Sequence, residues 1–279
     1  MSAPAHPLSA HPPSARTLIV IPARHASTRY PGKPLAELRG ASGEARSLVR
    51  RSWDAARAAV ATGAWDARVV VATDDERIRA HAEGFGAEVA MTPASCRNGT
   101  ERCAATLDVL GGGWDCVVNL QGDAPLTPPW YVEALLADMS LGGFEMRTPV
   151  LDSPPDHVAA LRADRAAGRV GGTTALCDAA GRALYFSKEV LPFGGDGAAV
   201  PVLHHVGLYA YTPAALEAYL SWPEGVLERA EGLEQLRFLE NGFPVGCTRV
   251  ESRGRPFWEL NNPADIARIE AIMAEIGMD

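Results

Sequence analysis

The chain has 279 residues, enough for one or two domains, and 47% of them are hydrophobic, so it can bury a full core. Its net charge of -8 argues against a protein that binds nucleic acid through bulk positive charge. No apolar run approaches the roughly 20 residues of a transmembrane helix. Residues 1–16, rich in Pro, Ala, Ser and His, lack the apolar segment of a secretory signal, so we predict a disordered tail and expect a cytoplasmic protein.

The chain contains five cysteines, an odd number, and they are widely spaced. It has no CxxC pair, and no group of cysteines and histidines has the spacing of a zinc site. We therefore interpret the cysteines as reduced thiols that pack as small hydrophobic side chains. They are Cys96, Cys103, Cys116, Cys177 and Cys247.

Short apolar runs alternate with helical patterns in the first half of the chain. The expected strands are 17–23, 68–73, 88–92 and 116–121, and their nearly continuous apolar character is typical of parallel strands covered on both faces. One helix is expected over 46–60. Another is expected after the second strand, where Thr73 or Asp74 can cap the helix and Gly84 can end it. This alternation predicts an α/β fold with a doubly wound, mostly parallel sheet.

The second half of the chain mixes strands and helices, which suggests an inserted or appended α+β lobe. The expected strands are 144–150, 173–178, 183–187 and 206–211. The expected helices are 212–222, 231–242 and 261–276.

Local signals indicate where these later helices begin and end. Thr212 can cap the first of them, with Pro213 at the first helical position. The dipeptide Asn-Gly at 241–242 ends the second, and Asn262 caps the third, which Pro263 opens. The last helix has one apolar face, made of Ile266, Ile269, Met273 and Ile276.

A basic loop follows the first expected strand, in the stretch IPARHASTRYPGK over 21–33. In open α/β sheets ligands bind beyond the carboxyl ends of the strands, and backbone amides with Arg and Lys make a phosphate cradle there. The loop is neither a Walker sequence nor a GxGxxG fingerprint. The alternative is a solvated basic loop, but its place at the end of a strand favours a nucleotide as ligand.

A carboxylate follows the last expected parallel strand, in the stretch NLQGDAP over 119–125. Asp123 would project into the same crevice as the basic loop. A lone carboxylate beside phosphates is a common anchor for Mg²⁺, which takes one or two carboxylates plus phosphate oxygens. The alternative is a plain turn, since Gly and Asp are both turn formers.

Three further stretches allow more than one interpretation. In RNGTER (97–102), Asn98, Gly99 and Thr100 can present polar groups to a base, or Asn98 or Thr100 can simply cap a helix. The pair at 204–205 in HHVGLYAY can bind a metal or a substrate, although such histidines are more often structural. Glu234 and Gln235 in GLEQLRFL read by default as part of a solvated helix face.

Taken in order, these stretches resemble the 3-deoxy-manno-octulosonate (Kdo) cytidylyltransferases, or CMP-Kdo synthetases. IPARHASTRYPGKPL looks like a signature of that family, with His25 at an aromatic position. VVATDDERI, GAEVAMTPASCRNGTER, VNLQGDAP, GRALYFSKEVLPF, HHVGLYAY and LEQLRFL follow in the order of the family. The resemblance covers nearly everything after residue 16.

The resemblance implies a fold, a reaction and an assembly. Such enzymes use CTP, a 2-keto sugar acid and Mg²⁺, form the CMP-sugar and release pyrophosphate, as a step of lipopolysaccharide biosynthesis. The fold would be a nucleotide-sugar transferase type α/β domain with a dimerisation lobe, in a homodimer. One domain would span 17–279, with a nucleotide-binding part over 17–150, a sugar-acid and dimerisation part over 151–250, and a closing segment with the terminal helix over 251–279.

The resemblance also implies roles for individual residues. The nucleotide would contact Pro22, Ala23, Arg24, Ser27, Arg29, Lys33, Asn98, Gly99, Thr100 and Gln121. The sugar acid would contact Tyr185, Ser187, Lys188, His205 and Gln235. The catalytic groups would be Arg24, Lys33 and Asp123, and the metal would lie at Asp123 and Asn261.

The chain departs from the family pattern on the metal and acceptor sides. Ala124 replaces a Glu, and Asn261 stands where a second metal-binding Asp is expected, although a neutral amide is a weaker ligand for Mg²⁺. Thr174 stands at a Lys position, while Lys188 and His204 stand at Arg positions. The acceptor can therefore also be a modified octulosonate, a nonulosonate or a phosphonate, and a non-catalytic nucleotide-binding homologue is a further alternative.

Overall fold

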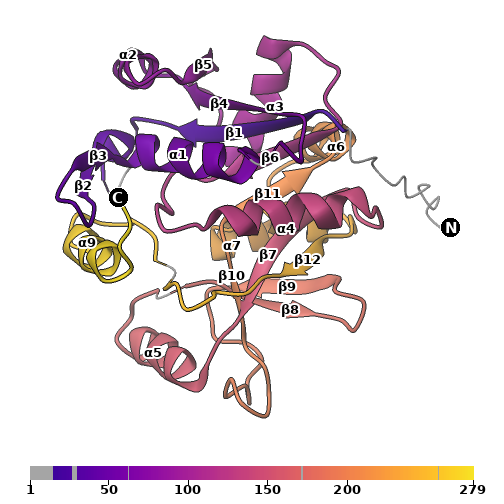
Figure 1. The fold of residues 1–279 in the computed structure, drawn as a ribbon. Coiled ribbons are helices and arrows are strands. Elements are labelled where there is room, and N and C mark those ends of the chain that lie inside the picture. The colour runs from indigo at the N-terminus through magenta and orange to yellow at the C-terminus, as the bar shows by residue number, and fades with distance from the viewer. Residues whose placement is uncertain (1–14, 27–29, 62, 171, 257) are drawn as a thin grey trace, which may run out of the picture. The chain divides into compact units, whose positions relative to one another are not determined.

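In the computed structural model the described residues are 15–26, 30–61, 63–170, 172–256 and 258–279 (Figure 1). They form two compact units, a nucleotide unit of Arg16–Glu133 with Glu251–Asp279, and an acceptor unit of Ala134–Val250. Each unit is named after the ligand that the sequence predicts in it. The predicted disordered tail lies, up to residue 14, outside the described residues. No helix within the described ranges is long and apolar enough to cross a membrane.

The nucleotide unit is built on parallel strands, in agreement with the sequence. Their spatial order is β5 (Glu88–Met91), β4 (Ala67–Thr73), β1 (Thr17–Ala23) and β6 (Cys116–Leu120) (Figure 1). Side chains of β1 from Leu18 to Ile21 are fully buried, as expected for a strand covered on both faces.

The helices of the nucleotide unit connect these strands. They are α1 (Leu48–Val60), α2 (Glu76–Gly84) and α3 (Gly99–Leu110), and α4 (Pro129–Ser140) follows β6 along the chain. The strand order runs one way from β1 through β4 to β5 and then returns to β6 on the other side of β1. Because such crossovers are right-handed, α1 and α2 cover one face and α3 the other. The order in which the chain adds strands therefore reverses between β1 and β6, although these two strands are parallel.

The predicted starts of two of these connecting helices, α1 and α2, are wrong. The cap of α2 is Asp75, whose carboxylate accepts a hydrogen bond from Arg77 N at 2.9 Å, and not Thr73 or Asp74. Residues at the start of the expected helix 46–60 belong instead to β3 (Ala45–Ser47), which pairs with β2 (Glu37–Arg39). In both cases the helix starts later, where a side-chain oxygen can satisfy its first free amides.

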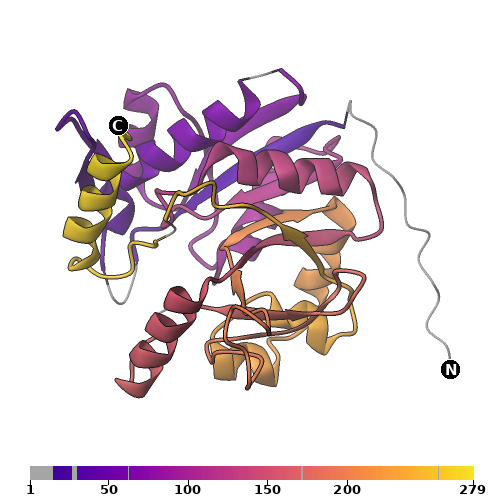
Figure 2. The same ribbon diagram turned by 60° about the horizontal axis from the view of Figure 1, so that its bottom comes forward.

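The terminal helix α9 (Asp265–Glu275) lies beside the hairpin β2–β3, as Figures 1 and 2 both show. It does not begin at Asn262 and Pro263 as predicted. The carboxylate of Asp265 instead accepts hydrogen bonds from the amides of Asn261 and Asn262, at 3.0 and 2.7 Å. A buried apolar cluster joins helix and hairpin, and it consists of Leu38, Leu48, Leu126, Leu260, Ile269 and Met273.

The acceptor unit has a sheet of mostly antiparallel strands, so the sheets of this α/β fold are of mixed direction. The order is β11 (Leu208–Tyr211), β7 (Met146–Asp152), β10 (Leu203–His205), β8 (Thr174–Cys177) and β9 (Ala183–Ser187). β12 (Gly246–Arg249) runs parallel to β7. The expectation of a mostly parallel sheet therefore holds for the nucleotide unit alone. Strands joined by short turns, such as β8 and β9, pair in opposite directions.

Helices α5 (Pro155–Ala166), α6 (Pro213–Ser221), α7 (Val226–Glu231) and α8 (Leu236–Glu240) complete this unit. Thr212 caps α6 as predicted, since its hydroxyl accepts a hydrogen bond from Ala215 N at 3.1 Å. The helix predicted over 231–242 ends before Asn241 and Gly242 as expected, but it begins later, at Leu236. Gly232 adopts a left-handed conformation with φ 61° and separates α7 from α8.

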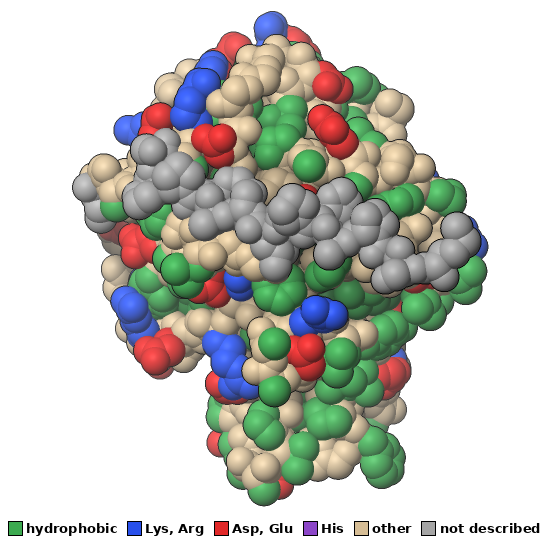
Figure 3. Space-filling view, turned by 90° about the vertical axis from the view of Figure 1, so that its right-hand side faces the viewer, with side chains coloured by type: hydrophobic (Ala, Val, Ile, Leu, Met, Phe, Trp, Pro, Cys, Tyr) green, Lys and Arg blue, Asp and Glu red, His purple; other side chains and the backbone are tan. Residues whose placement is uncertain are grey.

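None of the five cysteines forms a disulfide, and Cys103, Cys116 and Cys247 are buried as expected. Cys96 and Cys177 are only partly buried. On the face shown in Figure 3, basic and acidic side chains are scattered among apolar ones.

Candidate functional site

The carboxyl ends of β1 and β6 approach each other closely. A Cβ atom at Gly122, just after β6, would lie only 3.1 Å from the carbonyl oxygen of Pro22 on β1. Glycine allows this approach because it has no side chain. The strand order reverses between these two strands, which is where open α/β sheets bind their ligands. The predicted ligand residues at both strand ends therefore lie at the favoured position.

The described residues on either side of positions 27–29 in the basic loop contact each other. Gly32 N donates to His25 O at 2.9 Å, and Gly32 has φ 71°, a conformation that favours glycine. Arg24 is exposed, and its guanidinium donates to Arg97 O at 3.1 Å, in the loop before α3. The predicted phosphate ligands Ser27 and Arg29 lie outside the described residues.

Lys33 and Asp123 form an ion pair. Lys33 opens the short 3-10 helix η1 (Lys33–Leu35), and its Nζ atom lies 3.0 Å from a carboxylate oxygen of Asp123. The two side chains are 16% and 26% exposed, so both can be reached from solvent. The structure thus brings together two of the three residues that were predicted to be catalytic.

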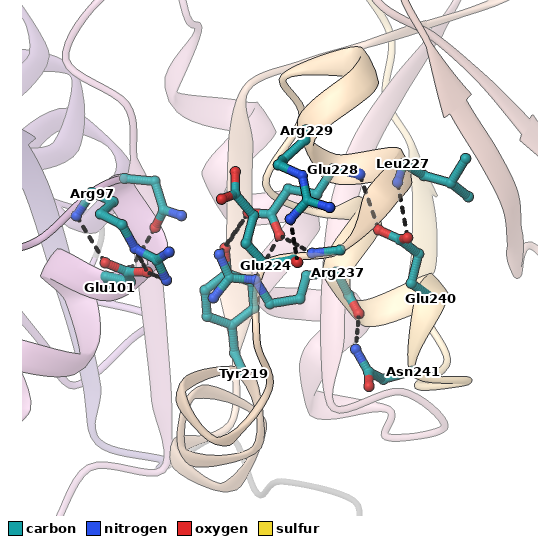
Figure 4. A network of polar contacts seen from close by, with 12 residues as sticks. Arg97, Glu101, Tyr219, Glu224, Leu227, Glu228, Arg229, Arg237, Glu240 and Asn241 are labelled. Carbon is teal, nitrogen blue, oxygen red and sulfur yellow. Dashed lines mark hydrogen bonds and ion pairs between the residues drawn. The ribbon is translucent and has the colours of Figure 1, made fainter.

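The N-terminus of α3 carries the residues predicted to frame the base. The side-chain oxygen of Asn98 accepts a hydrogen bond from Glu101 N at 2.9 Å, so Asn98 is the helix cap, one of the two readings of this stretch. Glu101 also pairs with Arg97 at 2.6 Å (Figure 4). Thr100 is buried. Amide groups at a helix N-terminus favour polar or anionic ligands.

Asn119 on β6 is a residue that the sequence interpretation missed. It is fully buried, and neither polar atom of its side chain has a hydrogen-bond partner among the residues that the structure describes. Its Nδ2 atom would lie 2.8 Å from a Cβ atom at Gly99, so a side chain at position 99 would have to displace the Asn119 amide. A polar residue inside an otherwise apolar buried strand was the sequence signal for it. Gln121, two residues later, is half-buried.

The residues proposed for the metal fit an ion that arrives with phosphate oxygens better than one held in a preformed cage. Leu260 N donates to Asp123 O at 2.8 Å, which ties the segment before Asn261 to the predicted metal ligand. The side-chain amide of Asn261 donates a hydrogen bond from Nδ2 to the carboxylate of Glu259 at 3.3 Å. Within the described ranges, no group of three or more His, Cys, Asp and Glu residues is arranged to hold a metal. Mg²⁺ accepts one carboxylate plus phosphate oxygens and water.

Three of the predicted acceptor residues meet around one carboxylate in the acceptor unit. Glu231, the last residue of α7, accepts hydrogen bonds from Ser187 Oγ at 2.7 Å and from Lys188 N at 2.9 Å. Burial raises the pKa of the Tyr185 phenol, and the adjacent charge of Glu231 raises this pKa further. The sequence interpretation missed Glu231. Gly232 directly after it was the available signal, because glycine commonly follows the end of a helix.

The other two acceptor residues, His205 and Gln235, lie in a buried cluster. His205 Nε2 and Thr148 Oγ1 are 2.9 Å apart, and Tyr209 OH donates to Gln235 Oε1 at 3.3 Å. The rings of His205 and Tyr209 have centroids 5.6 Å apart. Gln235 is only 1% exposed, so its default reading as part of a solvated face is wrong. Its Nε2 atom has no hydrogen-bond partner within the described part of the chain.

The adjacent histidines differ in their partners. Burial lowers the pKa of both His204 and His205 to about 3, so both are neutral near pH 7. His204 Nδ1 lies 3.4 Å from His157 Nε2. Because successive residues of a strand point to opposite faces, the two rings do not converge on one ion, and the reading of this pair as a metal site is not supported.

Thr174, at a position where the resemblance expects Lys, has a local structural role. Its hydroxyl donates to Glu189 O at 2.6 Å and accepts from Leu191 N at 3.2 Å. It therefore ties β8 to the segment that follows β9. The hydroxyl is buried and used twice, so a Lys at this position would need a different local path of the chain.

The comparisons with known proteins identify cytidylyltransferases as relatives. The sequence model of the cytidylyltransferase family matches residues 18–251. The 3-deoxy-manno-octulosonate cytidylyltransferase of Maricaulis maris (strain MCS10) is 44% identical over 267 residues, which cover 93% of this chain and 98% of that protein. The 8-amino-3,8-dideoxy-manno-octulosonate cytidylyltransferase of Shewanella halifaxensis (strain HAW-EB4) is 37% identical over 266 residues, which cover 92% and 98%.

A similar solved structure is that of CMP:2-keto-3-deoxy-manno-octonic acid synthetase complexed with CTP. It matches with a TM-score of 0.78 and 29% identity, and the match covers 94% of this chain and 100% of that chain.

Proposed function

The chain belongs to the cytidylyltransferase family, and on this premise we propose that it transfers CMP from CTP to the anomeric hydroxyl of Kdo and releases pyrophosphate. The structural observation that carries the proposal is the ion pair of Lys33 and Asp123 at the point where the strand order reverses. A cation and a carboxylate at that point suit a nucleotide triphosphate with its metal ion. Family membership does not support the alternative of a non-catalytic homologue.

The reaction needs little covalent chemistry from the protein. The hydroxyl oxygen of the acceptor attacks the α-phosphorus of CTP, and the bond from that phosphorus to the β-phosphate breaks. Such reactions depend on positioning and on neutralising charge. In the proposal, Arg24 and Lys33 bind the triphosphate, with Ser27 and Arg29 from the same loop.

The proposal assigns the cytidine to the strand ends of the nucleotide unit. Pro22 and Ala23 end β1, while Asn98, Gly99, Thr100 and Gln121 surround the start of α3 and the end of β6. A hydrogen-bonding site of this kind rejects bases with the wrong edge by a large factor, because buried polar groups would then stay unpaired. CTP should therefore be preferred over ATP and GTP.

Mg²⁺ would be held by Asp123, with Asn261 as a neutral second ligand. When bound, it neutralises the phosphate charge that develops during transfer. Lys33 and Asp123 neutralise each other in its absence. Because the two side chains are only 16% and 26% exposed, the bound metal and phosphates would have to replace the contact that is lost when the pair parts.

The proposal places the sugar acid at Tyr185, Ser187, Lys188, His205 and Gln235 of the acceptor unit. It also includes a homodimer and a cytoplasmic location. Light scattering of the purified protein tests the dimer, and a monomer at micromolar concentration would contradict it.

The function is tested by pyrophosphate release from CTP with a panel of acceptors, each with and without Mg²⁺. Kdo should give the highest kcat/KM, and reactions without acceptor serve as the control. Equal release with and without acceptor would indicate simple hydrolysis and would contradict the proposal. Equal use of CTP, ATP and GTP would contradict the assigned base site.

A second candidate acceptor is an amino-sugar acid. The similarity to the Shewanella halifaxensis protein, whose name specifies an 8-amino acid, keeps this candidate open. The panel should therefore include 8-amino-3,8-dideoxy-manno-octulosonate, a nonulosonate and a phosphonate. A higher kcat/KM for any of these than for Kdo would change the acceptor and leave CMP transfer intact.

A further inference from the structure

The carboxylate of Glu231 holds the chain where β9 ends. Ser187 Oγ donates to one oxygen of this carboxylate at 2.7 Å, and Lys188 N donates to the other at 2.9 Å. The hydroxyl of Ser187 in turn accepts from Glu189 N at 3.0 Å. Both oxygens of a single side chain therefore fix two consecutive residues that the sequence assigns to the sugar acid.

The same end of α7 also faces the side chains of the neighbouring residues. Burial is the main cause that raises the pKa of the Tyr185 phenol, and the charge of Glu231 is the next largest. A Cβ atom at Gly232 would lie 3.0 Å from Lys188 Nζ, so the glycine leaves room for the ammonium group. Tyr185, Ser187 and Lys188 thus all take their positions against one turn of chain, Glu231–Gly232.

Polar contacts hold the helix α7 that precedes this turn (Figure 4). Glu228 in α7 and Arg237 in α8 form a two-point ion pair, with both contacts at 2.7 Å and side-chain exposures of 6% and 2%. Glu240 accepts from the amides of Leu227 and Glu228 at the start of α7, at 2.9 and 3.0 Å. The ion pair of Glu228 with Arg237 therefore fastens α7 to α8 and supports the place of Glu231, independently of the contacts of Glu240.

We propose that Glu231 is a positioning residue for the sugar acid, which presents Ser187, Lys188 and Tyr185 to the acceptor without contacting the acceptor's carboxylate itself. The inference rests on the proposed function. Two like charges repel in a partly buried site, so the acid needs the ammonium of Lys188 and not a second carboxylate. Glu231 instead supplies geometry, because each of its oxygens fixes a donor of the chain that carries these groups.

Glu231→Gln is the central variant. The glutamine amide keeps the size of the side chain but replaces one of the two acceptor oxygens by an NH₂ donor. It therefore cannot accept from Ser187 Oγ with one atom and from Lys188 N with the other. We expect the KM for Kdo to rise about tenfold or more, as for the loss of a hydrogen bond to a charged group. The KM for CTP and kcat at saturating Kdo should change by less than about twofold. Glu231→Asp, which keeps the charge, should fall between parent and Glu231→Gln.

Glu240→Gln is the matched control. It makes the same chemical change in a side chain that also accepts two backbone N–H groups, but at the other end of α7. It should lower the Tm by an amount similar to Glu231→Gln and leave the KM for Kdo unchanged. An equal rise in the KM for Kdo in both variants would indicate a merely structural role and overturn the inference.

A second measurement does not depend on turnover. The phenol of Tyr185 should titrate at lower pH in Glu231→Gln than in the parent, because the neighbouring negative charge is gone. The charge of Glu240 also raises the pKa of Tyr185 but has a smaller effect, so Glu240→Gln should lower this pKa less than Glu231→Gln does. Tyr185→Phe identifies its signal in an ultraviolet difference titration. An unchanged Tyr185 titration would show that Glu231 does not act on this side chain.

The outcomes separate the inference from the proposed function. If the parent releases no pyrophosphate with any sugar acid, the proposed function is wrong. If the parent is active and Glu231→Gln raises the KM values for CTP and Kdo equally, the function stands and the role of Glu231 is wrong. Should Glu231→Gln fail to fold by circular dichroism, Glu231→Asp gives the same comparison of the two KM values.

Discussion

The Nζ atom of Lys33 lies 3.0 Å from a carboxylate oxygen of Asp123, although 90 residues separate them in the chain. The pair joins the phosphate loop after β1 to the turn after β6. In the absence of nucleotide each side chain compensates the charge of the other. In the presence of Mg²⁺ and CTP, we expect the lysine to turn to phosphate and the carboxylate to the metal.

The first prediction concerns this pair. Asp123→Asn should abolish pyrophosphate release, because it removes the carboxylate assigned to the metal. Lys33→Met should lower kcat/KM for CTP by about tenfold or more, since one charge-assisted contact to phosphate is lost. Lys33→Arg, which keeps the charge, is the control and should retain more activity than Lys33→Met. Full activity in Asp123→Asn would remove the metal assignment.

The second prediction concerns Asn261. With one carboxylate fewer than the family pattern offers, the metal should arrive largely with CTP, so the Mg²⁺ requirement should be shifted to higher concentration. Asn261→Asp should lower the Mg²⁺ concentration that gives half-maximal pyrophosphate release. Asn262→Asp, the adjacent change in the same Asn-Asn pair, is the control. If both variants behave as the parent does, the segment after Leu260 does not contribute to the metal site.

The third prediction concerns Arg24. Arg24 is exposed and binds a backbone carbonyl of the loop before α3, so its guanidinium is available near both assigned phosphate and base groups. Arg24→Ala should weaken CTP binding by about 1.5–3 kcal/mol, measured by titration calorimetry. Arg77→Ala, which removes an exposed charge from α2, is the control and should bind CTP as the parent does. Equal affinity of Arg24→Ala and parent would exclude the contact.

The fourth prediction concerns the stability of the acceptor unit. Arg237 and Glu228 are almost fully buried, and the guanidinium carbon lies 4.0 Å from the centre of the Tyr219 ring. Arg237→Ala should lower the free energy of unfolding by about 3–5 kcal/mol, because it leaves a buried carboxylate without its partner. Urea denaturation measures this loss.

The double variant Arg237→Met with Glu228→Leu is the informative comparison for that pair. It removes both charges and keeps apolar volume, so it should lose less stability than Arg237→Ala. If the double variant were less stable than Arg237→Ala, the burial of the lone carboxylate would not be the main cost. The loss of stability would then come mainly from the lost packing of Arg237 against Tyr219.

The nucleotide unit was largely predictable from the sequence, because its signals are local and agree with one another. The continuous apolar runs of β1 and β6 indicate strands buried on both faces, and the polar residues after them indicate a ligand site. The contact of Lys33 with Asp123 follows once both strands are placed. Asn119 was not recognised, because the pattern of a buried strand does not say which buried side chain lacks a partner.

The acceptor unit was harder to predict, because its ordering depends on contacts between segments. The helix expected over 231–242 includes Glu231 and Gly232, but Glu231 is the last residue of α7 and α8 begins only at Leu236. The break places Glu231 at a helix end and Gln235 at the start of the next helix, where it is buried. Local propensity could not favour this arrangement, since the buried pair of Glu228 and Arg237 stabilises it through tertiary packing.

The last prediction concerns the pH dependence of stability. Burial, with a smaller contribution from the neighbouring His204, lowers the pKa of His205 to about 3. An unfolded histidine titrates near pH 6.5, so below that pH the unfolded chain binds a proton that the folded chain does not. Stability should therefore fall as the pH drops below 6.5, by about 1.4 kcal/mol per such group at pH 5.5, with no contribution well above pH 6.5.

His205→Gln tests this directly. The amide can still bond to Thr148, but it cannot take up a proton, so the loss of unfolding free energy between pH 7.5 and 5.5 should be about 1.4 kcal/mol smaller than in the parent. Thr148→Val is the control, because it removes the 2.9 Å contact but keeps the buried histidine. It should be less stable at both pH values and keep the pH dependence of the parent. Urea denaturation of all three proteins gives the comparison. Identical pH dependence in His205→Gln and the parent would contradict the prediction, because it would mean that His205 takes up a proton in the folded state as readily as in the unfolded chain.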